Sequence, residues 1–137
     1  MTFAYNGPIR ILVIDDHMTM RLILRQLLTK VGFTDIDDAA CGQTALERLR
    51  DGNARFPDAI ITDLHMEGMD GLQFCNSVRR DKELKNSQVP IIVLTGDQES
   101  LLHEVSKQLG AVSVLTKPVA GEELKDHIIK AVGYSFA

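Results

Sequence analysis

The chain has 137 residues, the size of one ordinary domain, and 45% of them are hydrophobic, which is enough to fill a single core. A formal net charge of −4 leaves no basic excess for holding a nucleic-acid backbone, and the apolar runs are far too short to cross a bilayer. Because its start lacks the basic and apolar segments of a signal peptide, we expect one cytoplasmic domain over residues 1–137, without nucleic-acid binding or membrane insertion.

Short apolar runs recur along the chain and alternate with longer segments. They predict β-strands at Ile9–Ile14, Ile36–Ala39, Ala59–Thr62, Pro90–Leu94 and Val112–Thr116. At least three of these runs are apolar at nearly every position, which is typical of strands covered on both faces.

The segments between the strands have helical periodicity. Between the first two strands, apolar residues recur at intervals of three and four and predict one apolar stripe on a helix, formed by Met20, Ile23, Leu24, Leu27, Leu28 and Val31. Similar patterns predict further helices at Gly42–Arg50, Gly71–Arg80, Glu99–Leu109 and Gly121–Val132. Strict alternation of strands and helices predicts an α/β fold with a parallel sheet and helices on both faces.

Some conspicuous residues are expected to be structural. Cys41 and Cys75 have no partner at metal-binding spacing, so we expect ordinary reduced thiols. The acidic stretch 35–38 and the basic pair Arg79-Arg80 are expected to form solvated faces. Four of the seven aromatic residues lie in the first five and last four positions, and we expect these ends to fold back onto the domain.

Polar residues stand where four of the predicted strands end. Asp15 and Asp16 follow the first strand, Asp63 the third, Thr95 the fourth and Lys117 the fifth. In open α/β sheets the working site lies outside the carboxyl ends of the strands, so we expect these residues to converge there.

Three clustered carboxylates repel one another, raise the pKa of at least one member and favour a bound cation. An all-oxygen cluster suits Mg²⁺, and with no histidine or cysteine at ligand spacing zinc is a poor fit. A carboxylate can also attack phosphorus and form an acyl phosphate, while a metal, a lysine and a hydroxyl share the charge of the transition state. Taken singly, Asp15, Asp16 and Lys117 also fit a structural ion pair, or a helix cap at Asp16; the complete set favours a functional site.

These motifs resemble the receiver domain of two-component response regulators, close to the single-domain chemotaxis type. The resemblance covers about Ile9 to Val132 and rests on Asp15-Asp16, Asp63 after Ile60-Ile61-Thr62, Met69-Asp70-Gly71-Leu72, Thr95 after Ile91-Ile92-Val93-Leu94, and Lys117-Pro118. It implies a flavodoxin-like sheet of five parallel strands in the order 2-1-3-4-5, which is the order of the chemotaxis receivers.

The resemblance also implies roles for the site residues. Asp63 accepts the phosphoryl group, and Asp16, Asp63 and the backbone carbonyl of His65 bind Mg²⁺, with Asp15 acting through metal-bound water. The side chain of His65 faces solvent and has at most a modulating role.

Two further site residues follow from the same resemblance. Thr95 and Lys117 contact the phosphoryl group, and a cis peptide bond precedes Pro118. The domain is then a signalling phosphoacceptor and no enzyme in the ordinary sense: it takes the phosphoryl group in a Mg²⁺-dependent step and slowly hydrolyses it.

Partners are implied as well. A histidine kinase or histidine phosphotransfer protein donates the phosphoryl group against the first helix, where Met18 and Met20 are candidate contacts. A downstream target contacts the fourth helix, fifth strand and fifth helix. Met66 and Met69, in the loop beside Asp63, are expected to pack rather than bind an ion.

The chain departs from the family pattern at two positions. Val114 replaces the aromatic residue that commonly stands three positions before the lysine, and Glu67 replaces a proline four positions after the acceptor. An aromatic rotamer switch is therefore excluded at Val114. Because Gly96 follows Thr95, we expect the segment Thr95 to Leu102 to reorder on phosphorylation instead.

Three other functions are compatible with the topology. A flavin- or nucleotide-binding protein needs a Gly/Ser/Thr-rich cradle after the first strand, where Asp15-Asp16-His17 would repel phosphate. A phosphatase with an aspartyl nucleophile needs a second carboxylate two residues past the nucleophile, where His65 stands. A receiver-shaped binding module that is never phosphorylated needs no intact acceptor set.

Overall fold

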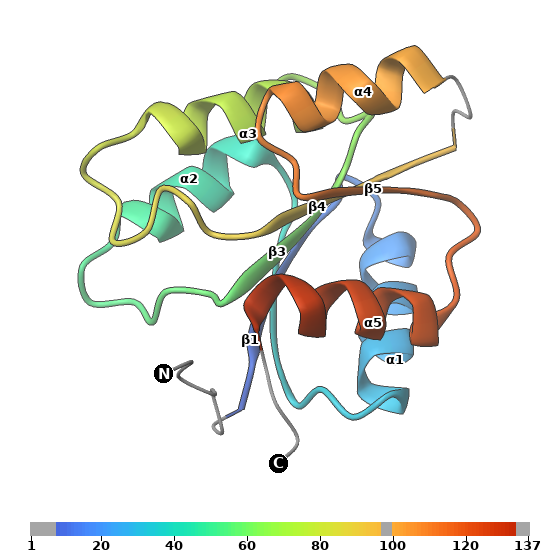
Figure 1. The fold of residues 1–137 in the computed structure, drawn as a ribbon. Coiled ribbons are helices and arrows are strands. Elements are labelled where there is room, and N and C mark those ends of the chain that lie inside the picture. Colours follow the sequence, from blue (N-terminus) through green and yellow to red (C-terminus); the bar gives the residue numbers. More distant parts are fainter. Residues whose placement is uncertain (1–7, 97–99, 134–137) are drawn as a thin grey trace.

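The computed structural model describes residues 8–96 and 100–133, which form strands and helices in strict alternation (Figure 1). The strands are β1 (Arg10–Ile14), β2 (Asp35–Ala39), β3 (Ala59–Asp63), β4 (Ile91–Thr95) and β5 (Ser113–Thr116). The helices are α1 (Met18–Lys30), α2 (Gly42–Arg50), α3 (Gly71–Arg80), α4 (Ser100–Gln108) and α5 (Gly121–Val132). The elements predicted from the sequence are confirmed, with ends that shift by one or two residues. The aromatic residues near the two termini lie outside the described residues.

The strands form one parallel sheet in the order β2-β1-β3-β4-β5, as predicted. Every residue of β3 and β4 is buried, because helices cover both faces of the sheet. The order places β1, β3, β4 and β5 side by side, so the residues at their carboxyl ends come together at one edge.

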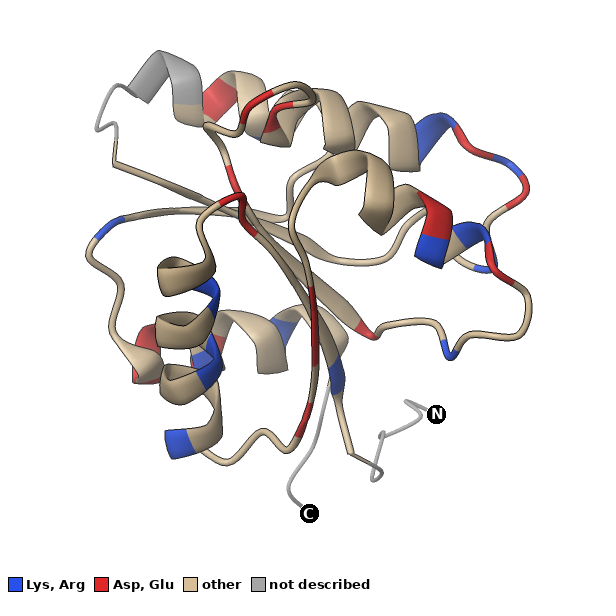
Figure 2. Ribbon diagram, turned by 180° about the vertical axis from the view of Figure 1, so that it is seen from behind, with Lys and Arg blue, Asp and Glu red and all other residues tan. Residues whose placement is uncertain are grey.

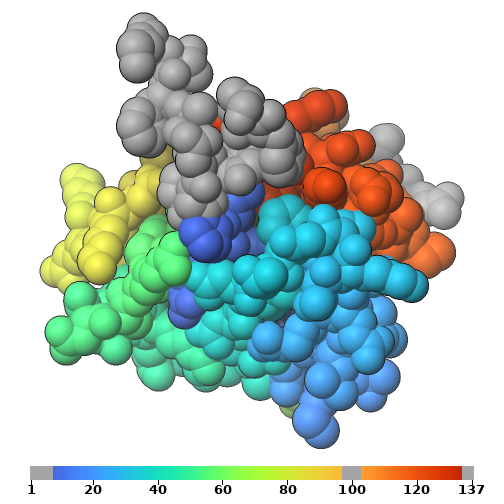
Figure 3. Space-filling model, turned by 90° about the horizontal axis from the view of Figure 1, so that it is seen from below, coloured from blue at the N-terminus to red at the C-terminus, as the bar shows by residue number. Residues whose placement is uncertain are grey.

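Two layers of helices enclose two hydrophobic clusters. Helices α2, α3 and α4 lie on one face of the sheet, where Phe74 and Val78 of α3 are fully buried (Figure 1). Helices α1 and α5 lie on the other face, where Leu28 and Ile128 are fully buried. From below, α1 and the segment after it form a continuous surface with α5 (Figure 3). Burial of one large apolar side chain, such as Phe74 or Leu28, stabilises the fold by about 1.5–3 kcal/mol.

The apolar stripe predicted for α1 is correct except at Ile23. Leu24 and Leu28 are buried, and Met20 packs against the cluster under α1 and α5, but Ile23 is 43% exposed. A helix lying on a sheet and one neighbour buries only the side that contacts them, so Ile23 faces solvent. Within the described residues, none of the helices is long and apolar enough to cross a membrane.

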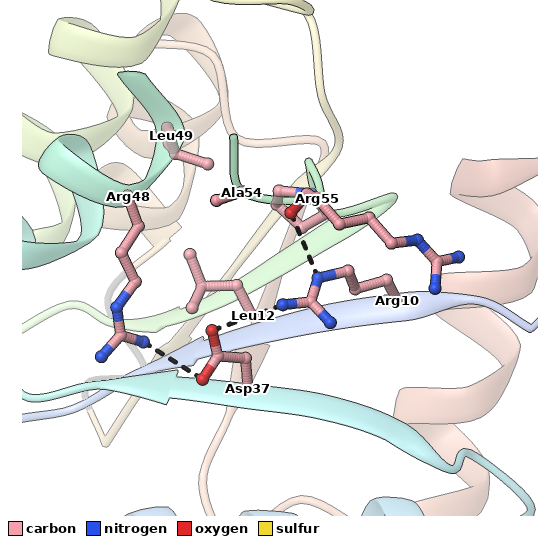
Figure 4. Close-up of a pocket in the computed structure, with 8 residues that line it drawn as sticks. Arg10, Leu12, Asp37, Arg48, Leu49, Ala54 and Arg55 are labelled. Carbon is pink, nitrogen blue, oxygen red and sulfur yellow. Dashed lines mark hydrogen bonds and ion pairs between the residues drawn. The ribbon is translucent and has the colours of Figure 1, made fainter. Parts of the chain in front are cut away.

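The acidic edge strand β2 is held by arginines and does not form a simple solvated face. Asp35 forms ion pairs with Arg10 at 2.7 Å and with Arg55 at 2.6 Å. Asp37 lies 3.2 Å from Arg48 (Figure 4). Acidic positions recur along this strand with basic positions on either side (Figure 2). Charges on this edge strand also discourage pairing with another sheet.

Arg79 also departs from the expected solvated face. Its guanidinium donates to the backbone carbonyl of Gly110 at 3.1 and 2.7 Å and to that of Ser87 at 2.8 Å. The side chain is half-buried, and burial lowers the pKa of Arg79. Arg79 therefore ties the end of α3 to the turn before β5.

Candidate functional site

Four predicted site residues meet at the carboxyl edge of the sheet. Asp63 ends β3, Thr95 ends β4, and Lys117 follows β5; Asp15 follows β1. Asp15 is 1% exposed, Asp63 is 7% exposed and Thr95 is fully buried. The Lys117 Nζ lies 2.6 Å from Asp63 Oδ1, and the Lys117 N–H donates to the carbonyl of Thr95 at 2.8 Å. The sheet order thus brings a lysine and two buried carboxylates together.

The loop after Asp63 is held by its own backbone. The Leu64 N–H donates to the carbonyl of Leu94 on the neighbouring strand at 2.8 Å, and the Gly71 N–H donates to the carbonyl of Leu64 at 2.8 Å. A Cβ on Gly71 would lie 2.6 Å from the carbonyl oxygen of Asp63. The first turn of α3 therefore packs directly against the backbone of the candidate acceptor, an approach that only glycine permits.

A capping box starts α3 at this point. The Asp70 carboxylate accepts from the Gln73 N–H at 2.8 Å, and the Gln73 side chain accepts from the Asp70 N–H at 2.9 Å. These bonds satisfy backbone donors at the helix start and fix where α3 begins. Met66 is buried and Met69 packs against the adjacent core, so both methionines of the loop are packing residues as predicted.

Asp15 is the most buried carboxylate of the site. Burial raises the pKa of Asp15, and the negative charge of Asp63 raises it further, while the His17 N–H and Lys117 oppose the shift. The His17 N–H donates to Asp15 Oδ1 at 2.9 Å, and Arg21 donates to the Asp15 carbonyl at 2.7 Å. The predicted rise in a carboxylate pKa is confirmed, but its main cause is loss of solvent rather than crowding of charges.

Replacing Asp15 with asparagine is expected to raise the free energy of unfolding in chelator at neutral pH by about 1–2 kcal/mol. Asparagine keeps an acceptor for the His17 N–H without a buried charge. Because the pKa of Asp15 is raised above 3.8, the folded wild type binds a proton before the unfolded chain does and gains stability as the pH falls through that window. The advantage of Asp15→Asn should therefore shrink on acidification.

Denaturant unfolding at neutral and mildly acidic pH measures both effects. Asp51→Asn, at an exposed aspartate in the turn after α2, is the matched control and should change little. A variant no more stable than wild type at neutral pH would contradict the assignment of a destabilising buried charge to Asp15.

Asp16 and His17 complete the acidic loop after β1. Asp16 Oδ2 accepts from the Glu67 N–H at 3.0 Å, whereas Asp16 Oδ1 is buried and has no hydrogen-bond partner. The His17 Nδ1 lies 3.0 Å from Asp16 Oδ1 and 3.3 Å from Asp15 Oδ1. One ligand atom from each of Asp15, Asp16 and His17 lies within 4.8 Å of the others.

His17 was missed by the sequence reasoning, and two expectations are corrected. The N-cap of α1 is His17, so Asp16 does not cap that helix. The expectation that no histidine stands at ligand spacing is wrong, because the backbone turn after Asp15 brings the His17 ring back onto both carboxylates. The only signal in the sequence was the position of His17 directly after the aspartate pair.

The carboxylate oxygens of this loop fit a hard divalent cation. A buried carboxylate oxygen without a hydrogen bond, such as Asp16 Oδ1, is costly unless a positive group compensates it. Asp63 does not belong to the group of three close ligand atoms; its carboxylate is paired with Lys117. His65 is exposed, as predicted for its side chain.

Other expectations near the site have mixed outcomes. The peptide bond between Lys117 and Pro118 is cis, as predicted. Val114 is half-buried against the core on the side of α2 and α3. The segment Thr95 to Leu102, expected to reorder, includes residues 97–99, which lie outside the described residues.

The two cysteines are free thiols, as expected. Burial raises the pKa of Cys75 to about 12.

The fold and the site define a flavodoxin-like α/β protein with an acidic carboxyl edge and one lysine facing it. The chain belongs to the response regulator receiver domain family, which its residues 11–129 match. It is 34% identical to chemotaxis protein CheY-3 of Vibrio cholerae over 130 residues, covering 95% of this chain and 96% of that protein. It is 36% identical to chemotaxis protein CheY of Pseudomonas aeruginosa over 121 residues, covering 88% and 94%.

Solved structures agree with this membership. A putative response regulator from Chloroflexus aurantiacus superposes with a TM-score of 0.81 at 28% identity, covering 93% of this chain and 99% of that one. The CheY4 chemotaxis protein of Vibrio cholerae superposes with a TM-score of 0.77 at 30% identity, covering 91% and 99%.

Proposed function

We propose that residues 1–137 form one receiver domain that accepts a phosphoryl group on Asp63 and signals by protein contact. The donor is a histidine kinase or histidine phosphotransfer protein. The observation that supports this most is the buried Asp63 carboxylate, held 2.6 Å from Lys117 beside the acidic loop of Asp15 and Asp16. A nucleophilic carboxylate next to a fixed cation is what phosphoryl transfer to an aspartate requires.

In the proposed reaction a carboxylate oxygen of Asp63 attacks phosphorus, and the phosphorus–nitrogen bond to the donor histidine breaks. Lys117 then pairs with a phosphoryl oxygen in place of the Asp63 carboxylate. The hydroxyl of Thr95, at the end of β4, donates a hydrogen bond to another phosphoryl oxygen. Mg²⁺ supplies further neutralisation of the phosphoryl oxygens when bound. Asp16, Asp63 and the His65 carbonyl would hold it, with Asp15 acting through a metal-bound water.

Exposed apolar residues support α1 as the donor-side contact. Met18, Leu22 and Ile23 are all exposed on this helix, which begins directly after the acidic loop. Met20 packs inward and is not part of this surface. A partner helix laid on these residues would bring its histidine toward Asp63.

The output surface is proposed to be α4, β5 and α5. Val114 of β5 lacks the ring that an aromatic switch needs, so we propose that the segment Thr95 to Leu102 reorders instead. Phosphorylation then favours one of two arrangements of α4, to the extent that the phosphorylated site interacts differently with each. The signal leaves through binding of a downstream protein to the favoured arrangement.

The test is the mass of the protein after incubation with acetyl phosphate and Mg²⁺. We expect wild type to gain one phosphoryl group and Asp63→Asn to gain none, with Asp51→Asn as the control for an exposed aspartate. A gain retained by Asp63→Asn would refute the acceptor assignment. Absence of any gain in wild type would favour a receiver-shaped binding module that acts without phosphorylation.

A further inference from the structure

The acidic loop contains a nitrogen donor in addition to its carboxylates. His17 Nδ1 is 3.0 Å from Asp16 Oδ1, yet that oxygen has no hydrogen-bond partner. A ring N–H at Nδ1 accounts for these contacts in the absence of an ion, since Nδ1 is also hydrogen-bonded to Asp15 Oδ1. A cation bound between the ring and the carboxylates would take the place of that proton. The hydrogen bond to Asp15 Oδ1, at 3.3 Å, places the same ring nitrogen beside the other carboxylate.

The distances from His17 Nδ1 to the two carboxylate oxygens match those between neighbouring ligands of one metal ion. An octahedral ion with ligands at about 2.1 Å separates neighbouring ligand atoms by about 3 Å. The two distances from His17 Nδ1 have this size, and all three donor atoms lie within 4.8 Å of one another. Asp16 and His17 can therefore occupy adjacent positions on one ion, with Asp15 close enough to act through a metal-bound water. The remaining positions are left for Asp63, the His65 carbonyl, water or phosphoryl oxygens.

The backbone explains why the ring turns inward. His17 is the N-cap of α1, but its side chain makes no capping hydrogen bond. Its N–H is held by Asp15 Oδ1 at 2.9 Å, which fixes the turn that returns the ring over the loop. The side chain is 74% exposed, so an ion can reach the nitrogen from solvent.

We propose that His17 Nδ1 is a direct ligand of the metal site and shifts its preference from Mg²⁺ toward borderline divalent ions such as Mn²⁺, Co²⁺ or Zn²⁺. Imidazole suits these transition metals, whereas Mg²⁺ favours oxygen donors. The inference rests on the metal site of the proposed function and specifies which class of ion that site selects.

Calorimetric titration of the full chain with Mg²⁺ and with Co²⁺ tests the inference. We expect His17→Ala to weaken Co²⁺ binding about tenfold or more and to leave Mg²⁺ binding within about twofold. The visible absorption of bound Co²⁺ should shift as well, because one nitrogen ligand is lost. Since oxygen sites also favour Co²⁺ over Mg²⁺ to some degree, the informative quantity is the change in the ratio of the two affinities.

Two further variants separate the possible failures. His103→Ala, which removes an imidazole from α4, should leave the ratio and the Co²⁺ spectrum unchanged. Asp16→Asn should weaken both ions; if it weakens neither, the metal site of the proposed function is wrong. If Asp16→Asn weakens both ions but His17→Ala changes them equally, or not at all, only the role of His17 is overturned. Unchanged circular dichroism of each variant confirms that it is folded.

Discussion

Replacing Lys117 with glutamine is expected to lower the free energy of unfolding in chelator by about 2 kcal/mol. The substitution removes the cation 2.6 Å from Asp63 and leaves that carboxylate buried beside Asp15. Breaking a fully buried ion pair costs about 3–5 kcal/mol, and the 26% exposure of the Lys117 side chain reduces this through solvent screening. Denaturant unfolding measures the loss.

A double-mutant cycle with Asp63→Asn identifies the cause of that loss. In the Asp63→Asn background, Lys117→Gln should cost little, because no charged carboxylate is left without its partner. Lys82→Gln, at an exposed lysine after α3, is the control for loss of a lysine charge alone. An equal loss in both backgrounds would show that Lys117 stabilises the fold through packing of its aliphatic chain rather than through Asp63.

Lys117→Gln should also slow phosphorylation by acetyl phosphate, by about a hundredfold. A positioned donor that meets charge only as it develops on the phosphoryl oxygens is worth about 10²–10³ in rate. The rate of mass gain at saturating Mg²⁺ measures this effect separately from stability. A rate equal to that of wild type would remove Lys117 from the proposed mechanism while leaving Asp63 as the acceptor.

Replacing Gly71 with alanine is expected to destabilise the protein by about 2–3 kcal/mol and to disturb the acceptor loop. The new Cβ would lie 2.6 Å from the Asp63 carbonyl oxygen and 3.0 Å from the Leu64 Cα, and both neighbours are backbone atoms. Backbone atoms of a buried strand end cannot move aside cheaply, so α3 or the loop must shift. Denaturant unfolding and the rate of phosphorylation should both decline.

Two other glycines provide matched controls for this substitution. Gly42→Ala places its Cβ 2.8 Å from the Met69 Sδ, the end of a flexible side chain that can rotate away, so the cost should be well under that of Gly71→Ala. Gly52→Ala meets no atom within 4 Å and should change stability by less than about 0.5 kcal/mol. The expected order of losses is therefore Gly71, Gly42, Gly52, and any other order contradicts the close-approach argument.

The site residues at strand ends were predictable because their signal is local. Asp63, Thr95 and Lys117 each follow an apolar run in the sequence, and parallel strands bring their carboxyl ends to one edge. The roles of these residues in phosphorylation stay predictions, since they rest on the family resemblance and on geometry. The membership in the receiver family is confirmed over residues 11–129.

Features that depend on distant contacts were missed. Arg79 was expected in solvent because its neighbour is also basic, yet its guanidinium reaches the carbonyl of Gly110, 31 positions along the chain. Asp35 was expected in solvent because the stretch 35–38 is acidic, yet two arginines from other segments pair with it. A charged residue in the sequence is compatible both with exposure to water and with an ion pair or hydrogen bond. Which of the two occurs depends on the residues that the fold brings near it.

The sequence by itself determined the alternation of strands and helices and the residues that stand at the carboxyl edge, because hydrophobic periodicity and strand ends are properties of neighbouring residues. Only the tertiary structure decided that Asp15 is deeply buried, that Lys117 pairs with Asp63, and that the ring of His17 turns back onto the acidic loop. Burial and side-chain direction arise from segments that are far apart in the chain, and they determine what the polar residues at this edge can bind.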